Sequence, residues 1–154
     1  MVKVRIAKPY RLWIYSVFAL IWASGVTFFV LSTWFQIEGD YGVQKHPFEF
    51  TALQIHGFAA FIMMVTYGYF LGTHVQAAWK VKPKRTFGVM LMIMPVFLMI
   101  TAYLLYYIAQ DVARQIIAYM HAGVGFFLPF ILISHVLRNR KKKKKKKSKS
   151  KSKS

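Results

Sequence analysis

Apolar residues in this chain gather into four long runs separated by short polar stretches. The runs cover residues 12–35, 50–79, 87–108 and 112–137. Each is close to or above the roughly 20 residues that a helix needs to cross the hydrocarbon core of a bilayer. A segment in lipid must satisfy its own backbone hydrogen bonds, so the pattern predicts four transmembrane helices. Because the links are short, consecutive helices should be antiparallel, which predicts an all-α, integral membrane, up-down-up-down four-helix bundle.

Composition supports a membrane protein and argues against a nucleic-acid partner. Of the residues, 56% are hydrophobic and 18% are aromatic, which is too apolar for an ordinary soluble domain of this length. The net charge of +18 falls in short clusters between the apolar runs rather than on one surface. The chain has no cysteine, so it holds no disulfide, thiolate-bound metal or covalently attached c-type haem.

Two regions of different composition divide the chain. Residues 1–140 should form one transmembrane domain, whereas residues 141–154 consist of seven lysines followed by alternating serine and lysine. Such a segment cannot bury apolar surface, so we expect a disordered tail. Its predicted role is to anchor the chain on anionic membrane lipid, at about 1 kcal/mol per basic residue near the surface. Two alternatives are that the tail binds an acidic partner, or that it was added to the natural chain by engineering.

The distribution of charge predicts an orientation in the membrane. All lysines and arginines except Lys45 and Arg114 lie at the N-terminus, between the second and third runs, or after the fourth run. By the positive-inside rule, both termini should lie in the cytoplasm. The N-terminal basic residues resemble the start of a signal peptide. The apolar run that follows is long enough to span, so we interpret it as a retained helix.

Histidines supply the candidate chemistry. Four of the five lie within predicted spans, two on the second span and two on the fourth, and the first and third spans carry none. Polar ionisable groups inside a membrane are normally functional or paired, and neutral imidazole is a common haem ligand. These four candidate metal ligands are His56, His74, His121 and His135.

Spacing arranges these histidines in two levels. His56 and His74 are 18 positions apart, which on an α-helix returns to the same face after about 27 Å. His121 and His135 are 14 positions apart, which gives an offset of about 40° and a separation of about 21 Å. The second and fourth spans should run in the same direction, so His56 should pair with His121 and His74 with His135. The unequal separations favour the first pairing over the second.

Other residues near the histidines fit a bound haem. Gly57 and Gly123 reduce backbone bulk where a flat macrocycle would approach, although close helix packing explains such glycines equally well. Arg114 could reach a propionate of the outer haem, the one that His56 and His121 would hold on the side away from the cytoplasm. His46, in the first loop, should face water or a propionate rather than iron. Four basic residues could reach a propionate of the inner haem, the one that His74 and His135 would hold near the cytoplasm, although the positive-inside rule alone explains their position: Lys82, Lys84, Arg85 and Arg138.

The chain resembles the bacterial membrane cytochromes b, including small four-helix di-haem proteins catalogued only as a domain of unknown function. The resemblance rests on the segments around the four span histidines, and covers roughly residues 10 to 138. It departs from the family in the longer spacing on the second span and in the lack of a convincing quinol-site motif. It implies that the four histidines are axial ligands of two haem b groups, in the bacterial inner membrane. The segments are Gln54-Ile55-His56-Gly57, Gly72-Thr73-His74, Met120-His121-Ala122-Gly123 and Ser134-His135.

The leading function is therefore transmembrane electron transfer between a quinone pool and a redox partner protein, as a subunit of a respiratory complex. The chain has little mass outside the predicted spans to hold a catalytic domain, so the electron donor or acceptor should be another protein. The sequence does not decide whether the chain is the electron-transfer subunit of an oxidoreductase complex. Pro47-Phe48-Glu49 is a candidate quinone contact, but Glu49 fits a helix start equally well. The alternatives are a transporter whose histidines relay protons or ions, and an assembly subunit without a cofactor.

Overall fold

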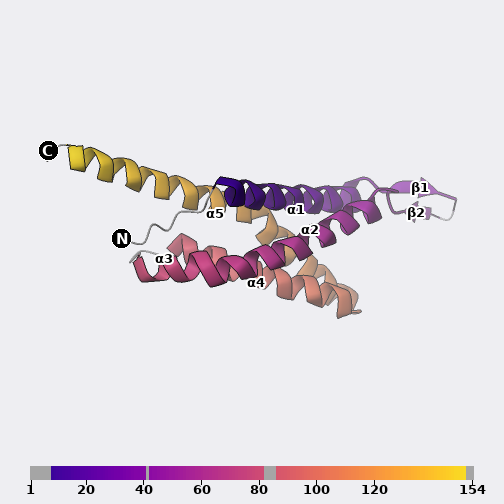
Figure 1. Cartoon of the computed structure of the whole chain (residues 1–154). Helices are drawn as coiled ribbons and strands as arrows, with labels where there is room; N and C mark the ends of the chain where they lie inside the picture. The colour runs from indigo at the N-terminus through magenta and orange to yellow at the C-terminus, as the bar shows by residue number, and fades with distance from the viewer. Residues whose placement is uncertain (1–7, 41, 82–85, 152–154) are drawn as a thin grey trace. The chain divides into compact units, whose positions relative to one another are not determined.

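The chain is helical almost throughout in a computed structural model that describes residues 8–40, 42–81 and 86–151, with side chains up to residue 138 (Figure 1). Its elements are α1 (Lys8–Trp34), β1 (Ile37–Gly39), β2 (Gly42–Gln44) and α2 (Glu49–Phe70). A π-helix, η1 (Leu71–Val75), and α3 (Gln76–Val81) continue α2, and α4 (Thr86–Tyr107) and α5 (Asp111–Lys151) follow.

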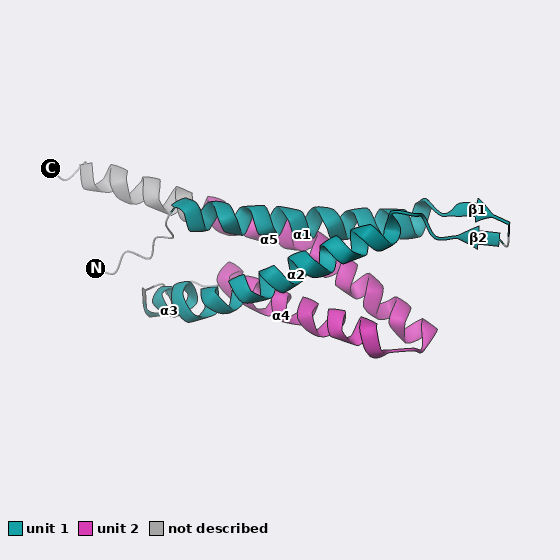
Figure 2. Cartoon of the chain, turned by 45° about the vertical axis from the view of Figure 1, so that its right-hand side comes forward, with its two compact units in different colours: residues 1–83 teal, residues 84–154 magenta. Residues whose placement is uncertain are grey.

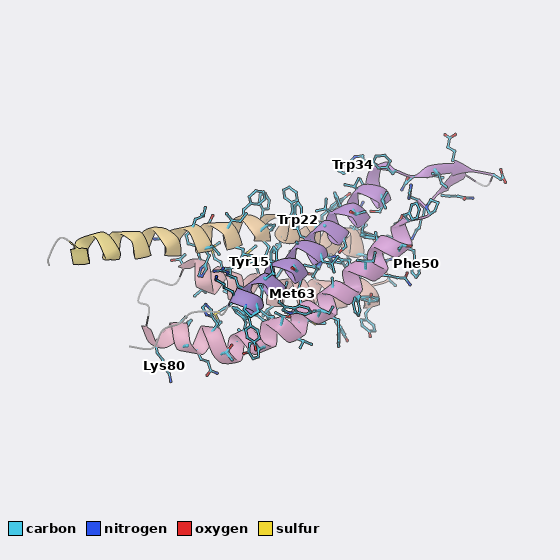
Figure 3. All side chains as sticks on the ribbon, turned by 45° about the horizontal axis from the view of Figure 1, so that its top comes forward. Tyr15, Trp22, Trp34, Phe50, Met63 and Lys80 are labelled. Carbon is cyan, nitrogen blue, oxygen red and sulfur yellow. The ribbon has the colours of Figure 1, made fainter. Side chains whose placement is uncertain are left out.

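Four helices are long and apolar enough to cross a membrane: Lys8–Trp34, Glu49–Lys80, Thr86–Tyr107 and Asp111–Arg138. They coincide with the four predicted runs to within a few residues at each end, which confirms the all-helical fold and is compatible with a multi-pass membrane protein. Large apolar side chains are exposed along all four helices, as Figure 3 illustrates on the ribbons, and only Val17 and Leu128 among them are buried. A surface of this kind suits lipid contact, because hydrocarbon and apolar side chains mix without cost.

The chain divides into two compact units, residues 1–83 and 84–154 (Figure 2). In the first unit α1 packs against α2, and a small hairpin joins them. Its strands β1 and β2 pair antiparallel, with Ile37 opposite Gln44 and Gly39 opposite Gly42. Gly42 has φ 105°, which only glycine adopts readily, so the hairpin turn depends on this residue. In the second unit α4 packs against α5 after a link of three residues, 108–110.

Two features differ from the sequence prediction. The second span is not one α-helix, because a π turn separates α2 from α3. The fourth helix continues to Lys151, so residues 141–151 are helical in the structure where composition predicts disorder. Lysine is a good helix former, which favours the continuation of α5, although like charges four residues apart on a helix repel each other.

Candidate functional site

His56 lies on α2, and its ring packs against α1. Its Nδ1 lies 2.9 Å from the backbone oxygen of Ile21 and 3.4 Å from Oγ of Ser24. Because a carbonyl oxygen only accepts hydrogen bonds, Nδ1 must donate and therefore bears the proton of the neutral ring. This hydrogen bond assigns the lone pair to Nε2, the nitrogen with which the ring would bind a metal.

Gly25 makes this contact possible. A Cβ atom at position 25 would lie 2.7 Å from Cε1 and 2.9 Å from Nδ1 of His56, closer than real Cβ atoms come to other atoms. Ser24, the preceding residue, is buried, and its hydroxyl donates to the backbone oxygen of Leu20 at 2.7 Å. The ring of His56 is therefore held in place by backbone and small side chains of α1.

The second unit places its histidine in a similar way. His121 lies on α5, and its Nδ1 is 2.8 Å from Oγ1 of Thr101 on α4. Thr101 is only 5% exposed, so this hydrogen bond lies between the packed helices. In both units, a histidine of the second helix forms a hydrogen bond through Nδ1 to a polar group of the first helix.

The other two span histidines have different surroundings. His74 lies inside η1, with its ring centroid 5.2 Å from that of Phe70. His135 lies on α5, half-buried, and a Cβ atom at Gly88 of α4 would be 3.9 Å from its Cε1, an ordinary contact distance. Both histidines are half-buried within the protein.

The π turn corrects the predicted position of His74. A π turn takes one residue more than an α turn. The distance from His56 to His74 along the axis is therefore about 26 Å rather than about 27 Å, and the rotation falls short of a full return by up to about 100°. His56 and His74 are therefore not on the same helix face, as an unbroken α-helix would place them. Their separation along the axis is slightly closer to that of His121 and His135 on α5.

The other residues predicted to lie near a haem, Gly57, Gly123 and Arg114, have few neighbours within their own units. A Cβ atom added at Gly57 or Gly123 would meet nothing within 4 Å, so there is open space beside both. Arg114, in the first turns of α5, is exposed. The guanidinium of Arg138 lies 5.4 Å from the ring centre of Phe87. The other basic residues predicted near the inner level, Lys82, Lys84 and Arg85, lie outside the described residues.

At the start of α2, Glu49 is buried and lies 3.9 Å from Nζ of the exposed Lys45. His46 is half-buried, and its Nδ1 accepts the backbone N–H of Phe48 at 3.2 Å. The ring of His46 also lies 5.7 Å from that of Phe48. These contacts organise the chain as it enters α2. That His46 faces water or a propionate rather than iron stays a prediction.

The structure brings His56 together with α1 and His121 with α4, each within its own unit. The pairings of His56 with His121 and of His74 with His135 join different units, and they stay predictions. Within the described ranges no group of three or more His, Cys, Asp or Glu side chains could hold a metal ion. A bis-histidine haem site is a different arrangement, since it takes only two protein ligands.

Sequence reasoning did not find Ser24, Gly25 and Thr101. One signal was present, because Thr101 is the only serine or threonine in residues 87–107. A lone hydroxyl in an apolar span is expected to bond its own backbone, and the sequence carries no sign that it also meets a histidine. The contact depends on how two helices pack, which local pattern does not encode.

No protein-family model, curated protein or solved structure matches this chain. The resemblance to the membrane cytochromes b stays an expectation from the histidine segments. The function must therefore be inferred from the geometry of the four histidines.

Proposed function

We propose that this chain is a two-haem membrane cytochrome b that transfers electrons across a bilayer. His56, His121, His74 and His135 would be the axial ligands, with the first two holding one haem b and the last two the other. The bound iron supplies one-electron reduction and oxidation, and the chain supplies the ligands and an apolar environment.

The observation that carries this proposal is the hydrogen bond from Nδ1 of His56 to the backbone oxygen of Ile21. Histidines that bind metals almost always donate their other ring N–H to a carbonyl, carboxylate or water, which orients the ring and raises its basicity. His56 has this arrangement inside an apolar span. The tautomer is the one that haem ligation requires.

The residues of each unit would have distinct tasks. Ile21 orients the His56 ring, and the small side chains at positions 24 and 25 let the ring approach α1. Open space beside Gly57 and Gly123 would admit the edge of a macrocycle without displacing a side chain. The apolar lining of the spans would exclude water, which protects the imidazoles from competing protonation.

The proposal includes a location and partners. The helices would form an up-down-up-down bundle in the bacterial inner membrane, with both termini and the basic tail on the cytoplasmic side. A redox partner protein and a quinone, the membrane-soluble carrier, would supply and remove electrons. The chain would work as a subunit of a hetero-oligomeric respiratory complex.

Purified protein should contain two non-covalent haems per chain, measured as pyridine haemochrome, with b-type absorption bands after reduction. His56→Ala and His121→Ala should each reduce the ratio from two to one and remove the same spectral component. His74→Ala and His135→Ala should remove the other component. His46→Ala, which changes a histidine outside the spans, is the matched control and should keep both haems.

The proposal would be contradicted if wild-type protein bound no haem even after reconstitution with an excess of the cofactor. A proton-relay protein would instead remain colourless and lose ion transport in liposomes when the span histidines are replaced. Loss of the same single haem in His56→Ala and His74→Ala would refute the two-level arrangement, although not haem binding itself.

A further inference from the structure

Thr101 is a buried hydroxyl with three neighbours in hydrogen-bonding range. Its Oγ1 lies 2.9 Å from the backbone oxygen of Phe97, 3.1 Å from that of Leu98 and 2.8 Å from Nδ1 of His121. The residue is 5% exposed, in the middle of an apolar helix, where leaving a polar group without a partner is costly.

The single hydroxyl proton can serve either the backbone of α4 or Nδ1 of His121. A hydroxyl that donates to Nδ1 leaves both carbonyl contacts without a proton and puts the ring proton on Nε2. Thr in helices commonly donates to the carbonyl three or four residues earlier, which favours the arrangement in which its oxygen accepts from His121 and Nδ1 of the neutral ring carries the proton. The lone pair of His121 is thereby assigned to Nε2, as it is in His56.

His56 and His121 differ in the group that accepts the hydrogen bond from Nδ1. Nδ1 of His56 is closest to a backbone carbonyl, at 2.9 Å, with the Ser24 hydroxyl farther away at 3.4 Å. Nδ1 of His121 has a side-chain hydroxyl at 2.8 Å. The strength of such a bond controls the basicity of the opposite ring nitrogen, and more basic ligands favour oxidised iron.

We propose that Thr101 is a positioning residue for His121. Its hydroxyl accepts the Nδ1 proton, selects the tautomer with the lone pair on Nε2, and sets the basicity of that nitrogen. If His121 binds haem as in the proposed function, Thr101 also controls the reduction potential of that haem. Thr101 acts through His121 and does not itself bind the cofactor.

Substitution at position 101 separates the hydroxyl from the shape of the side chain. Thr101→Val keeps the branched shape but removes the acceptor, so the His121 ring loses the bond that selects its tautomer. Thr101→Ser keeps the hydroxyl. Thr66 on α2 offers a matched control, because it also bonds a carbonyl four residues earlier, that of Ile62 at 2.8 Å, in an apolar span. Thr66→Val removes an equivalent helix bond away from the histidine contacts described above.

Nitrogen-15 NMR of histidine-labelled, haem-free protein in lipid measures the tautomer directly. Wild type and Thr101→Ser should show His121 protonated on Nδ1, identified by the signal that disappears in His121→Ala. Thr101→Val should shift population to the Nε2-protonated form, and Thr66→Val should not. An unchanged His121 signal in Thr101→Val would overturn the positioning role, whether or not the protein binds haem.

Redox titration of the haem-loaded protein provides the second measurement. In Thr101→Val, the component that His121→Ala removes should become easier to reduce, by up to about tenfold in the equilibrium constant, or about 59 mV for one electron. The other component should not move, and Thr101→Ser should restore the wild-type potential. Equal potentials in Thr101→Val and wild type would refute control of the potential. Absence of haem from the wild-type chain would instead refute the proposed function, with the NMR result still deciding the tautomer.

Discussion

At the scale of single residues, the position of His56 depends on how closely its ring approaches the backbone of α1. The hydrogen bond from Nδ1 to Ile21 brings the ring over Gly25, where no Cβ atom fits without a shift. The ring cannot keep this bond and also retreat from α1. A glycine on one helix therefore determines the geometry of a histidine on another.

Gly25→Ala should displace the His56 ring and weaken haem binding at that level. A Cβ atom 2.7 Å from Cε1 forces a shift, and overpacking of this kind typically costs about 1–3 kcal/mol. Haem content should fall from two toward one per chain, with loss of the component that His56→Ala removes. Gly68→Ala is the control, since a Cβ atom there meets nothing within 4 Å. Full haem content in Gly25→Ala would show that the close contact does not position the ligand.

The candidate ligands could be predicted from sequence because an imidazole in an apolar span is conspicuous by its chemistry alone. Their hydrogen-bond partners could not. Ser24 and Gly25 resemble ordinary small residues of helix packing, and their meaning depends on the crossing of α1 and α2. The partner of His56 is a backbone oxygen, that of Ile21, which no residue type reveals.

At the scale of elements, hydrophobic run length predicted four helices and nearly all of their ends, because spanning helices follow from bilayer thickness. It did not predict the hairpin of β1 and β2 or the π turn at Leu71–Val75. Each spans only a few residues, and neither changes the apolar pattern on which the prediction depended. The π turn nevertheless rotates His74 relative to His56, and π turns inside helices often occur at functional sites.

Deletion variants of the second span test whether the rotation of His74 matters. Removing Val65, in the α-helical stretch between His56 and the π turn, should turn His74 and the chain after it by about 100° relative to His56. We expect loss of the haem held by His74, so that haem content falls from two to one per chain while the His56 component persists. Deletion of Gly72 should instead convert the π turn to α-helix and keep nearly the same rotation between the two histidines, so it should retain both haems. Two haems in the Val65 deletion variant would mean that the rotation of His74 is not needed for ligation.

At the scale of the whole chain, acidic and basic residues lie at opposite ends of the four apolar helices. Every acidic residue lies in or next to the two connections that join α1 to α2 and α4 to α5, namely Glu38, Asp40, Glu49 and Asp111. Nearly all basic residues lie at the opposite ends of the helices. If all four helices span, this separation places the hairpin and the 108–110 link on the same side of the membrane, away from the cytoplasm.

Labelling of single cysteines tests this arrangement cleanly, because the chain contains no cysteine of its own. Asp40→Cys in the hairpin region and Gln110→Cys before α5 are at exposed positions, as is Lys80→Cys near the end of α3. A membrane-impermeant maleimide added to intact bacterial cells should label Asp40→Cys and Gln110→Cys. Lys80→Cys should react only after the inner membrane is permeabilised, because the positive-inside rule places it in the cytoplasm. Labelling of Asp40→Cys and Gln110→Cys from opposite sides would require an odd number of spans between them, and the second and fourth spans would then run in opposite directions. His56 would lie at the level of His135 in that case, so the same experiment decides which histidines can share a haem.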